Sequence, residues 1–372
     1  MKITDYAKRL IPVFFITALT IFTVSDVSAN GASTTNTTVE AQVSSYQRVF
    51  IDALSLSNNI ISEPTLRDIL VYLPTAYFTS EARLPVIYFL PGFGANSIGD
   101  VKVKTDFDQS FTKLQPSIVV IIPGTTRFGG GFFVDSAVTG KWSEFVVKDV
   151  VNYIDANYRT LAKRQSRGIA GHSMGGFGAL DLAMRHSDVF GSVFAMAPGL
   201  VSNKGITDTQ MFDSDAHIKQ FITSTAPVKN STAKEALISL LNHPNKFDIA
   251  YGMAFAPMDK PPYFEYPYRL QGNTLVRDDA ILAKWNSGFG AVQSEISEFK
   301  TQLKSLNGIG LDCGRNDEFQ WIVRGCDYYS SELKAAGIEH IYTTHEGFHM
   351  KNLRERTLDF MLPFFSHRLE TK

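Results

Sequence analysis

The 372-residue sequence contains only two cysteines, Cys313 and Cys326. Two thiols are too few to build a disulfide scaffold or a zinc site with four thiolates. Charge of one sign is also missing, because 36 Lys+Arg stand against 37 Asp+Glu and the basic residues form no clustered patch. Nucleic acids and anionic membrane surfaces attract such patches, so neither is expected as the main partner.

Long apolar runs are absent except near the start of the chain. The run from Leu10 to about Val24 follows three basic residues and precedes small residues that end at Ala29. It is shorter than the stretch of about 20 residues that spans a bilayer. We therefore expect a signal peptide at residues 1–29, with an uncleaved anchor as the alternative. Cleavage after Ala29 predicts a secreted or periplasmic protein without a stable membrane span, and residues 30–44 are expected to form a flexible leader.

Strand and helix patterns alternate along residues 45–372. Val86–Leu90 and Ile118–Ile122 are short and almost entirely apolar, which is typical of central strands that helices cover on both faces. Ser143–Tyr158 instead repeats apolar residues at helical spacing. This alternation predicts an α/β fold with a mostly parallel central sheet flanked by helices.

The alternation stops between residue 200 and about residue 298. Because a strand pattern resumes at Gly308–Cys313, we interpret this stretch as an insertion in a single domain, placed before the strand that leads to the candidate acid. Its aromatic residues either line an acyl or aryl pocket or, as we favour, pack a small core of the insertion. They are Tyr263, Phe264, Tyr266, Tyr268 and Trp285.

The pattern Gly-His-Ser-Met-Gly at residues 171–175 is the first to indicate chemistry. Gly-x-Ser-x-Gly between a strand and a helix is typical of a nucleophile elbow, in which a strained turn exposes the serine hydroxyl above the sheet. An apolar strand pattern precedes this motif and an Ala/Leu/Met-rich helix pattern follows it. The motif predicts that Ser173 is a nucleophile. We interpret the neighbouring His172 as a packing residue, because its position on so tight a turn directs it away from the reacting face.

A serine hydroxyl needs a base, and the base needs an acid that orients it. His349 lies between the last strand pattern and the last helix pattern, where the base is expected, and His345 is the alternative. Asp317 is the favoured acid because it lies in a loop that follows a strand, at the edge where functional groups collect in open α/β sheets. Glu318 and Asp312 remain alternatives for the acid.

A tetrahedral intermediate at Ser173 would need two backbone N–H donors. The amide of Met174, at the start of a helix, is the first candidate. The second is the amide of Phe93 in the loop Leu-Pro-Gly-Phe-Gly at residues 90–94. The glycine-rich segment Arg127–Phe133 lacks the Lys-Ser/Thr ending of a phosphate loop, and we expect it to be flexible and to border the cleft.

Neither a metal nor another cofactor is expected, since the histidines lack metal-ligand spacing and the proposed chemistry needs none. Cys313 and Cys326 lie on either side of the candidate acid. In an exported protein they either form a disulfide that ties the acid loop to the next helix or remain two buried free thiols.

These motifs together resemble the esterase family of the α/β-hydrolase superfamily. That family includes S-formylglutathione hydrolases, feruloyl and acetyl-xylan esterases and the antigen 85 mycolyltransferases. The resemblance covers about residues 45–200 and 300–367. Two positions depart from the family pattern: Pro91 replaces a common His or Asp, and Lys351 replaces a frequent tryptophan after the base. The segments that carry the resemblance are residues 90–94, 171–176, 312–319 and 347–349.

The resemblance implies an α/β-hydrolase fold and a serine esterase that acts through an acyl-enzyme intermediate. It implies the triad Ser173, Asp317 and His349, with the amides of Phe93 and Met174 as oxyanion donors. The implied partner is a small-molecule or carbohydrate-linked ester. An acyltransferase of the antigen 85 type, which passes the acyl group to a sugar or another alcohol, is the first alternative. A non-catalytic binding protein on the same fold is the second.

Overall fold

The computed structural model describes residues 45–95 and 104–372. The predicted signal peptide at residues 1–29 and the predicted leader at residues 30–44 lie outside this part of the chain. Within the described residues, no helix has both the length and the apolar character needed to cross a membrane.

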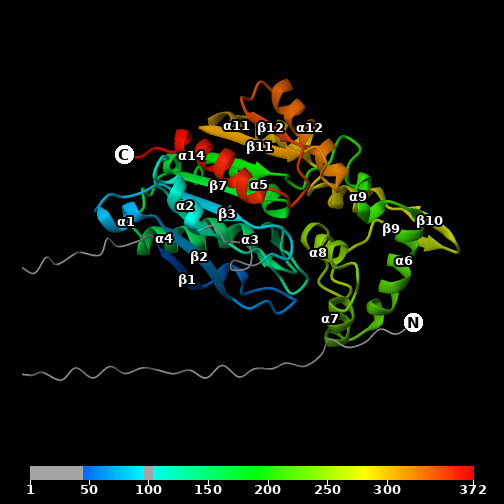
Figure 1. The fold of residues 1–372 in the computed structure, drawn as a ribbon. Helices are drawn as coiled ribbons and strands as arrows, with labels where there is room; N and C mark the ends of the chain where they lie inside the picture. Colours follow the sequence, from blue (N-terminus) through cyan, green and yellow to red (C-terminus); the bar gives the residue numbers. More distant parts are fainter. Residues whose placement is uncertain (1–44, 96–103) are drawn as a thin grey trace, which may run out of the picture. The chain divides into compact units, whose positions relative to one another are not determined.

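An eight-stranded sheet forms the centre of the fold, in the order β1-β2-β4-β3-β7-β8-β11-β12 (Figure 1). The first two strands are antiparallel to each other, and β2 is antiparallel to β4. All pairs from β4 to β12 are parallel. The predicted mostly parallel α/β sheet is therefore confirmed. The strands are β1 Ser45–Asp52, β2 Leu66–Leu73, β3 Val86–Leu90, β4 Ile118–Ile121, β7 Arg167–His172, β8 Ser192–Met196, β11 Gly308–Gly314 and β12 Ile341–His345.

Helices cover both faces of this sheet, which explains why its central strands are apolar throughout. Tyr88 of β3 points into a core with α4 and α5, whereas its neighbour Ile87 points into a second core with α2 and α14. Successive residues of a strand face opposite sides, so burial on both sides removes any polar alternation. The helices of these layers are α2 Lys104–Ser110, α3 Trp142–Glu144, α4 Val151–Asn157, α5 Met174–Arg185, α12 Gln320–Ala335, α13 Leu353–Arg356 and α14 Leu362–Arg368.

Several elements differ in their ends from the sequence pattern. The pattern of residues 46–56 predicts one strand, but β1 stops at Asp52 and residues 54–56 form a 3₁₀ turn. The helix expected at Ser143–Tyr158 runs from Trp142 to Asn157 and contains a π-helical turn at residues 145–150. The closing helix also contains such a turn, at residues 357–361, between α13 and α14.

The insertion folds into helices and one hairpin at one end of the sheet (Figure 1). Tyr263, Phe264 and Trp285 are at most 2% exposed. The expected role in packing is thus confirmed for these three residues, whereas Tyr266 and Tyr268 are partly exposed. The sequence interpretation assigned no helices or strands to the insertion. The elements are α6 Asp215–Thr225, α7 Ala233–Leu241, α8 Lys246–Phe255, β9 Tyr268–Gln271, β10 Thr274–Arg277, α9 Asp279–Asn286 and α10 Val292–Glu298, and α11 Lys300–Ser305 follows the insertion.

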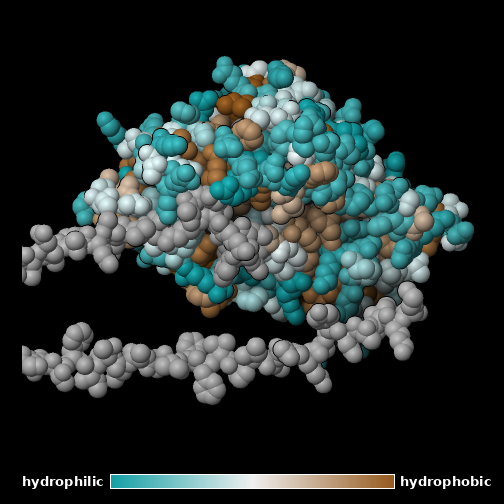
Figure 2. Space-filling model, in the orientation of Figure 1, coloured by the Kyte–Doolittle hydropathy of each residue, from teal (hydrophilic) through white to brown (hydrophobic). Residues whose placement is uncertain are grey.

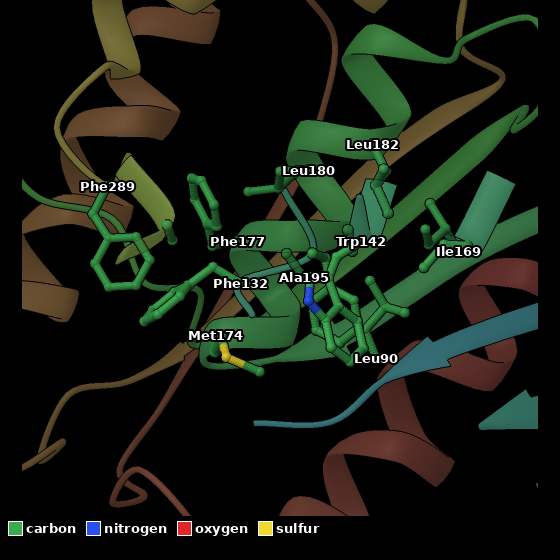
Figure 3. Packing of buried hydrophobic residues seen from close by; sticks show 14 of the residues in the cluster. Leu90, Phe132, Trp142, Ile169, Met174, Phe177, Leu180, Leu182, Ala195 and Phe289 are labelled. Carbon is green, nitrogen blue, oxygen red and sulfur yellow. The ribbon is translucent and has the colours of Figure 1, made fainter. Parts of the chain in front are cut away.

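The expectation for the glycine-rich segment Arg127–Phe133 was wrong. Phe128, Phe132 and Phe133 are at most 1% exposed and belong to the main core. A Cβ atom added to Gly130 would lie 2.4 Å from the Met174 sulfur, so the glycine allows the segment to pack closely behind the start of α5. Figure 3 shows Phe132 beside Met174 in this core.

Both cysteines are free thiols in the structure, and both are buried. Cys313 lies on β11 and Cys326 on α12. Of the two alternatives that the sequence left open, the structure thus contains the pair of free thiols. Burial together with a hydrogen bond to Cys313 raises the pKa of the Cys326 thiol well above its usual value, so it stays protonated.

Candidate active site

Ser173 lies in a strained turn between β7 and α5. Its φ of 57° and ψ of −117° are uncommon for a residue with a side chain. The backbone around it is packed too closely for larger residues. A Cβ atom at Gly171 would lie 2.1 Å from the Gly175 carbonyl oxygen, and one at Gly175 would lie 1.9 Å from that of Leu90. The two glycines of the motif therefore let strand and helix meet tightly enough to hold the serine in this conformation.

The Ser173 peptide is also fixed by hydrogen bonds. Its N–H donates to the carbonyl oxygen of Met196, at 2.9 Å. Its carbonyl oxygen accepts from the amides of Phe177 and Gly199, each at 3.0 Å. The serine is therefore attached to β8 and α5 on both sides of the turn.

Asp317 and His349, which are 32 positions apart in the sequence, meet in the structure. His349 Nδ1 lies 2.7 Å from Asp317 Oδ2, and the residues are 5% and 1% exposed. The second carboxylate oxygen accepts from the Phe319 amide at 2.8 Å. A carboxylate only accepts hydrogen bonds, so the neutral imidazole carries its proton on Nδ1 and leaves Nε2 free to accept one.

The alternative acids have other partners. Glu318 Oε2 accepts from the backbone amide of His349, at 3.0 Å, rather than from its ring. Asp312 is fully buried and forms an ion pair with Arg356. Of the three acidic candidates, Asp317 is the one with a hydrogen bond to the His349 imidazole.

The other two histidines considered also have other roles. His345 Nδ1 accepts from the Gly347 amide at 3.0 Å. His172 is 2% exposed, and its Nε2 lies 3.0 Å from the carbonyl oxygen of His349. Burial, with the neighbouring His349 and Arg356, lowers the pKa of His172 well below its usual value. His172 thus lies next to the site, but it contacts the backbone of the candidate base.

One cavity, about 440 Å³ in volume, contacts both Ser173 and His349. On the face drawn in Figure 2, apolar side chains gather near the middle of the molecule. Gln210, Phe247 and Phe289, which line this cavity, all come from the insertion, and the sequence analysis did not identify them. Their contact with the site depends on how the insertion folds, so no spacing in the sequence indicates it. The apolar lining includes Phe93, Met174, Phe247, Phe289, Phe319, Trp321, Met350, Leu353 and Met361.

Both predicted oxyanion donors lie beside the serine. Phe93 and Met174 line the same cavity as Ser173. A Cβ atom added to Gly92 would lie 3.4 Å from the Ser173 Cβ, so the loop that carries Phe93 approaches the serine closely. Within the described part of the chain, neither amide donates to a protein acceptor. Two N–H groups without protein acceptors in the described part of the chain are thus available beside Ser173.

No group of three or more His, Cys, Asp or Glu side chains arranged to hold a metal ion occurs among residues 45–95 and 104–372.

Residues 64–219 match the sequence model of the family described as "Putative esterase". This segment, which we call the esterase segment, is similar to that family. It contains β2 to β8, the elbow and the loop with Phe93. An esterase of Mycobacterium tuberculosis is 34% identical over 128 residues, which represent 33% of this chain and 27% of the relative. The matched stretch is thus about a quarter of that curated esterase.

Solved structures with the same fold extend the likeness beyond the esterase segment. A ferulic acid esterase has a TM-score of 0.59 at 19% identity, covering 88% of this chain and 99% of that structure. An S-formylglutathione hydrolase from Agrobacterium tumefaciens has a TM-score of 0.53 at 16% identity, covering 87% and 95%. At these identities the comparison establishes the α/β-hydrolase fold.

Proposed function

We propose that this chain is a serine esterase that cleaves carboxylic esters through an acyl-enzyme intermediate. Ser173 attacks the ester carbonyl while His349 Nε2 takes the hydroxyl proton. The negative charge that develops on the carbonyl oxygen is stabilised by the amides of Phe93 and Met174. The protonated imidazole then gives its proton to the departing alcohol, and Asp317 stabilises the imidazolium in between.

The second half of the reaction repeats these steps with water. His349 removes a proton from the water, whose oxygen attacks the acyl carbon. Collapse of the second tetrahedral intermediate breaks the bond to Ser173, and the imidazolium returns the proton to the serine oxygen. The carboxylic acid leaves and the enzyme regains its starting state.

One observation carries this proposal. His349, whose Nδ1 lies 2.7 Å from Asp317 Oδ2, lines the same cavity as the strained Ser173. A buried carboxylate-imidazole pair beside a partly exposed hydroxyl on an elbow is the arrangement that activates a serine. The three residues come from three separate loops at the carboxyl edge of the sheet, where ligands bind in this class of fold.

The cavity also supports a class of substrate. Its lining is mainly aromatic and aliphatic, with Gln210 and Arg354 among the few polar contributors. We propose an ester whose acyl group is apolar or aromatic, on a small alcohol or a carbohydrate. The names of the structural neighbours, ferulic acid esterase and S-formylglutathione hydrolase, place aryl and thiol esters within the range to be tested.

Export forms part of the proposal. The apolar run after the first basic residues, followed by small residues ending at Ala29, supports a cleaved signal peptide. N-terminal sequencing of the protein recovered outside the cytoplasm is expected to begin at Asn30. A mature chain that retains Met1 would contradict this part of the proposal.

The decisive experiment compares the wild-type protein with Ser173→Ala on a panel of p-nitrophenyl, feruloyl and acetylated-sugar esters. We expect turnover on at least one ester class and a loss of about 10⁴-fold or more in the variant. A fluorophosphonate probe should label the wild type at Ser173 and leave the variant unlabelled. Equal activity of both proteins would refute the assignment of the nucleophile. Accumulation of a new ester when an alcohol is added would indicate acyl transfer in place of hydrolysis.

A further inference from the structure

The loop that carries His349 has no regular secondary structure. It lies between β12 and α13, and its neighbours Phe348 and Met350 are 47% and 56% exposed. These side chains therefore contribute little packing, yet His349 itself is only 5% exposed. Buried peptide groups need hydrogen-bond partners, and here neither a helix nor a sheet supplies them. The position of the imidazole thus depends on contacts from other parts of the chain.

Three side chains supply those contacts. The His349 N–H donates to Glu318 Oε2 at 3.0 Å. The His349 carbonyl oxygen accepts two hydrogen bonds, from Arg356 Nη1 at 3.0 Å and from His172 Nε2 at 3.0 Å. Both lone pairs of that oxygen are thereby used, and the donors approach from α13 and from the end of β7.

Arg356 is itself held rigidly. It is 1% exposed, and its Nε and Nη2 groups donate to the carboxylate of Asp312, at 2.5 to 3.2 Å. The guanidinium is planar, so fixing two of its nitrogens also fixes the third, which donates to His349. Asp312 lies on β11, five positions before the proposed acid. Arg356 therefore connects the loop of the base to the strand that positions Asp317.

His172 connects the same loop to the nucleophile. It is the last residue of β7 and is bonded directly to Ser173. A carbonyl oxygen only accepts hydrogen bonds, so His172 carries a proton on Nε2. Its ring centre lies 4.7 Å from that of His349.

We propose that His172 and Arg356 are positioning residues, which hold the His349 carbonyl oxygen from two sides and so fix the imidazole relative to the Ser173 hydroxyl. This inference rests on the proposed esterase function. A misplacement of about 1 Å in a catalytic group can reduce the rate by about 100-fold. The contact through His172 is the more direct, because it ties the base to the residue next to the nucleophile.

The test uses conservative variants at both positions. His172→Leu removes the N–H donor and keeps a side chain of similar size. His172→Gln again offers an N–H group that can reach the His349 carbonyl oxygen. Arg356→Lys keeps the positive charge but loses the planar guanidinium, which donates to Asp312 and to His349 at the same time. His186→Leu is the matched control, because His186 is half-buried and bonded to Ser143 through its Nε2, at 3.1 Å, outside the cavity. Circular dichroism and thermal melting establish whether each variant folds. If Arg356→Lys does not fold, the two His172 variants are sufficient to test the proposal.

We expect kcat to fall about 10- to 100-fold in His172→Leu and Arg356→Lys, with KM changed by less than about threefold. His172→Gln should recover most of the rate. The combined variant should lose less than the product of the two single losses, because both donors act on one oxygen. A kcat within about twofold of the wild type in His172→Leu, or an equal loss in His186→Leu, would overturn the proposal.

A second measurement does not depend on activity. The proton on His349 Nδ1 is hydrogen-bonded to a carboxylate and gives a separate downfield NMR signal, which Asp317→Asn identifies by its loss. We expect this signal to shift or broaden in His172→Leu and Arg356→Lys and to persist in His186→Leu. An unchanged signal in both test variants would overturn the proposal. If no ester is cleaved by the wild type, the esterase assignment fails, whereas this measurement still tests the positioning.

Discussion

The nucleophile and the base of the proposed triad are held in different ways. Ser173 lies between a strand and a helix that are adjacent in sequence, and its strained conformation depends on Gly171 and Gly175. His349 lies in an irregular loop whose peptide is held by side chains from residues 172, 318 and 356. The comparison teaches that a local motif can specify one half of a site, while the other half requires the folded chain.

The test with the largest expected effect compares substitutions of the two neighbouring acids, Asp317 and Glu318. Asp317→Asn removes the carboxylate that orients the His349 ring, and we expect kcat to fall about 10⁴-fold. Glu318→Gln still presents an oxygen to the His349 amide, so we expect a loss of less than about tenfold. Steady-state kinetics on the best ester of the panel measures both. A larger loss in Glu318→Gln would reverse the roles assigned to these residues.

A second test changes only the elbow that holds Ser173. The Cβ of Gly175→Ala would lie 1.9 Å from the Leu90 carbonyl oxygen, and strand and helix would have to separate. We expect the free energy of unfolding to fall by about 3 kcal/mol or more and esterase activity to be lost.

The matched control for this change is Gly337→Ala. Gly337, unlike Gly175, has a positive φ, of 68°, and an added Cβ there would approach only the end of Lys304, at 3.9 Å. Its expected cost of about 1–2 kcal/mol comes from backbone strain alone. Urea unfolding of both variants measures the difference, and equal costs would mean that the close approach at the elbow is unimportant.

A third test asks how far the elbow helix depends on the insertion. Arg185, at the end of α5, donates to Asp181 on α5 and to Glu295 on α10, each at 2.7 Å. Burial and the nearby Asp181 charge raise the pKa of Glu295 to about 8. Between its usual value of 4.5 and about 8, the folded protein keeps a proton that the unfolded chain has lost. The free energy of unfolding should therefore fall as pH rises through this window, by up to about 1.4 kcal/mol per pH unit.

Glu295→Gln removes the titrating group and should flatten this pH dependence. Glu298→Gln, an exposed change on the same helix, should leave most of it, because Glu298 contributes little to the raised pKa of Glu295. Urea unfolding at pH 5 and pH 8 provides the measurement. A wild-type protein that is more stable at pH 8 than at pH 5 would contradict the sign, unless the same rise persists in Glu295→Gln and so arises elsewhere.

The smallest expected effect concerns the two thiols behind the acid loop. Cys313 and Cys326 are buried and free in the structure. Denaturation followed by alkylation without a reductant should label both, as seen in the intact mass. Cys326→Ser should then change kcat by less than about threefold, because neither thiol lines the cavity. A mass two hydrogens lower without alkylation would show that the protein contains the disulfide.

Much of the fold could be predicted because its signals are local. The apolar runs of β3 and β4 and the helical spacing of residues 143–158 reflect burial on two faces and on one face. The missed features depend on distant partners. The segment with Phe128 and Phe132 is glycine-rich and looks like a loop, but its glycines allow tight packing against Met174. The contribution of Phe247 and Phe289 to the cavity could not be predicted, since it depends on how the insertion folds.

The amino-acid sequence by itself determined most strands and helices outside the insertion, the elbow around Ser173 and three candidate acids, because each follows from residues that are neighbours along the chain. Only the tertiary structure decided which acid contacts the His349 ring. Asp312, Asp317 and Glu318 all lie on β11 or shortly after it, and the sequence does not show which way their side chains point. The tertiary structure also gave His172 and Arg356 a common acceptor, the His349 carbonyl oxygen. Hydrogen bonds of that kind join positions 7 and 177 residues apart, and their geometry arises only when β7, β11 and α13 pack together.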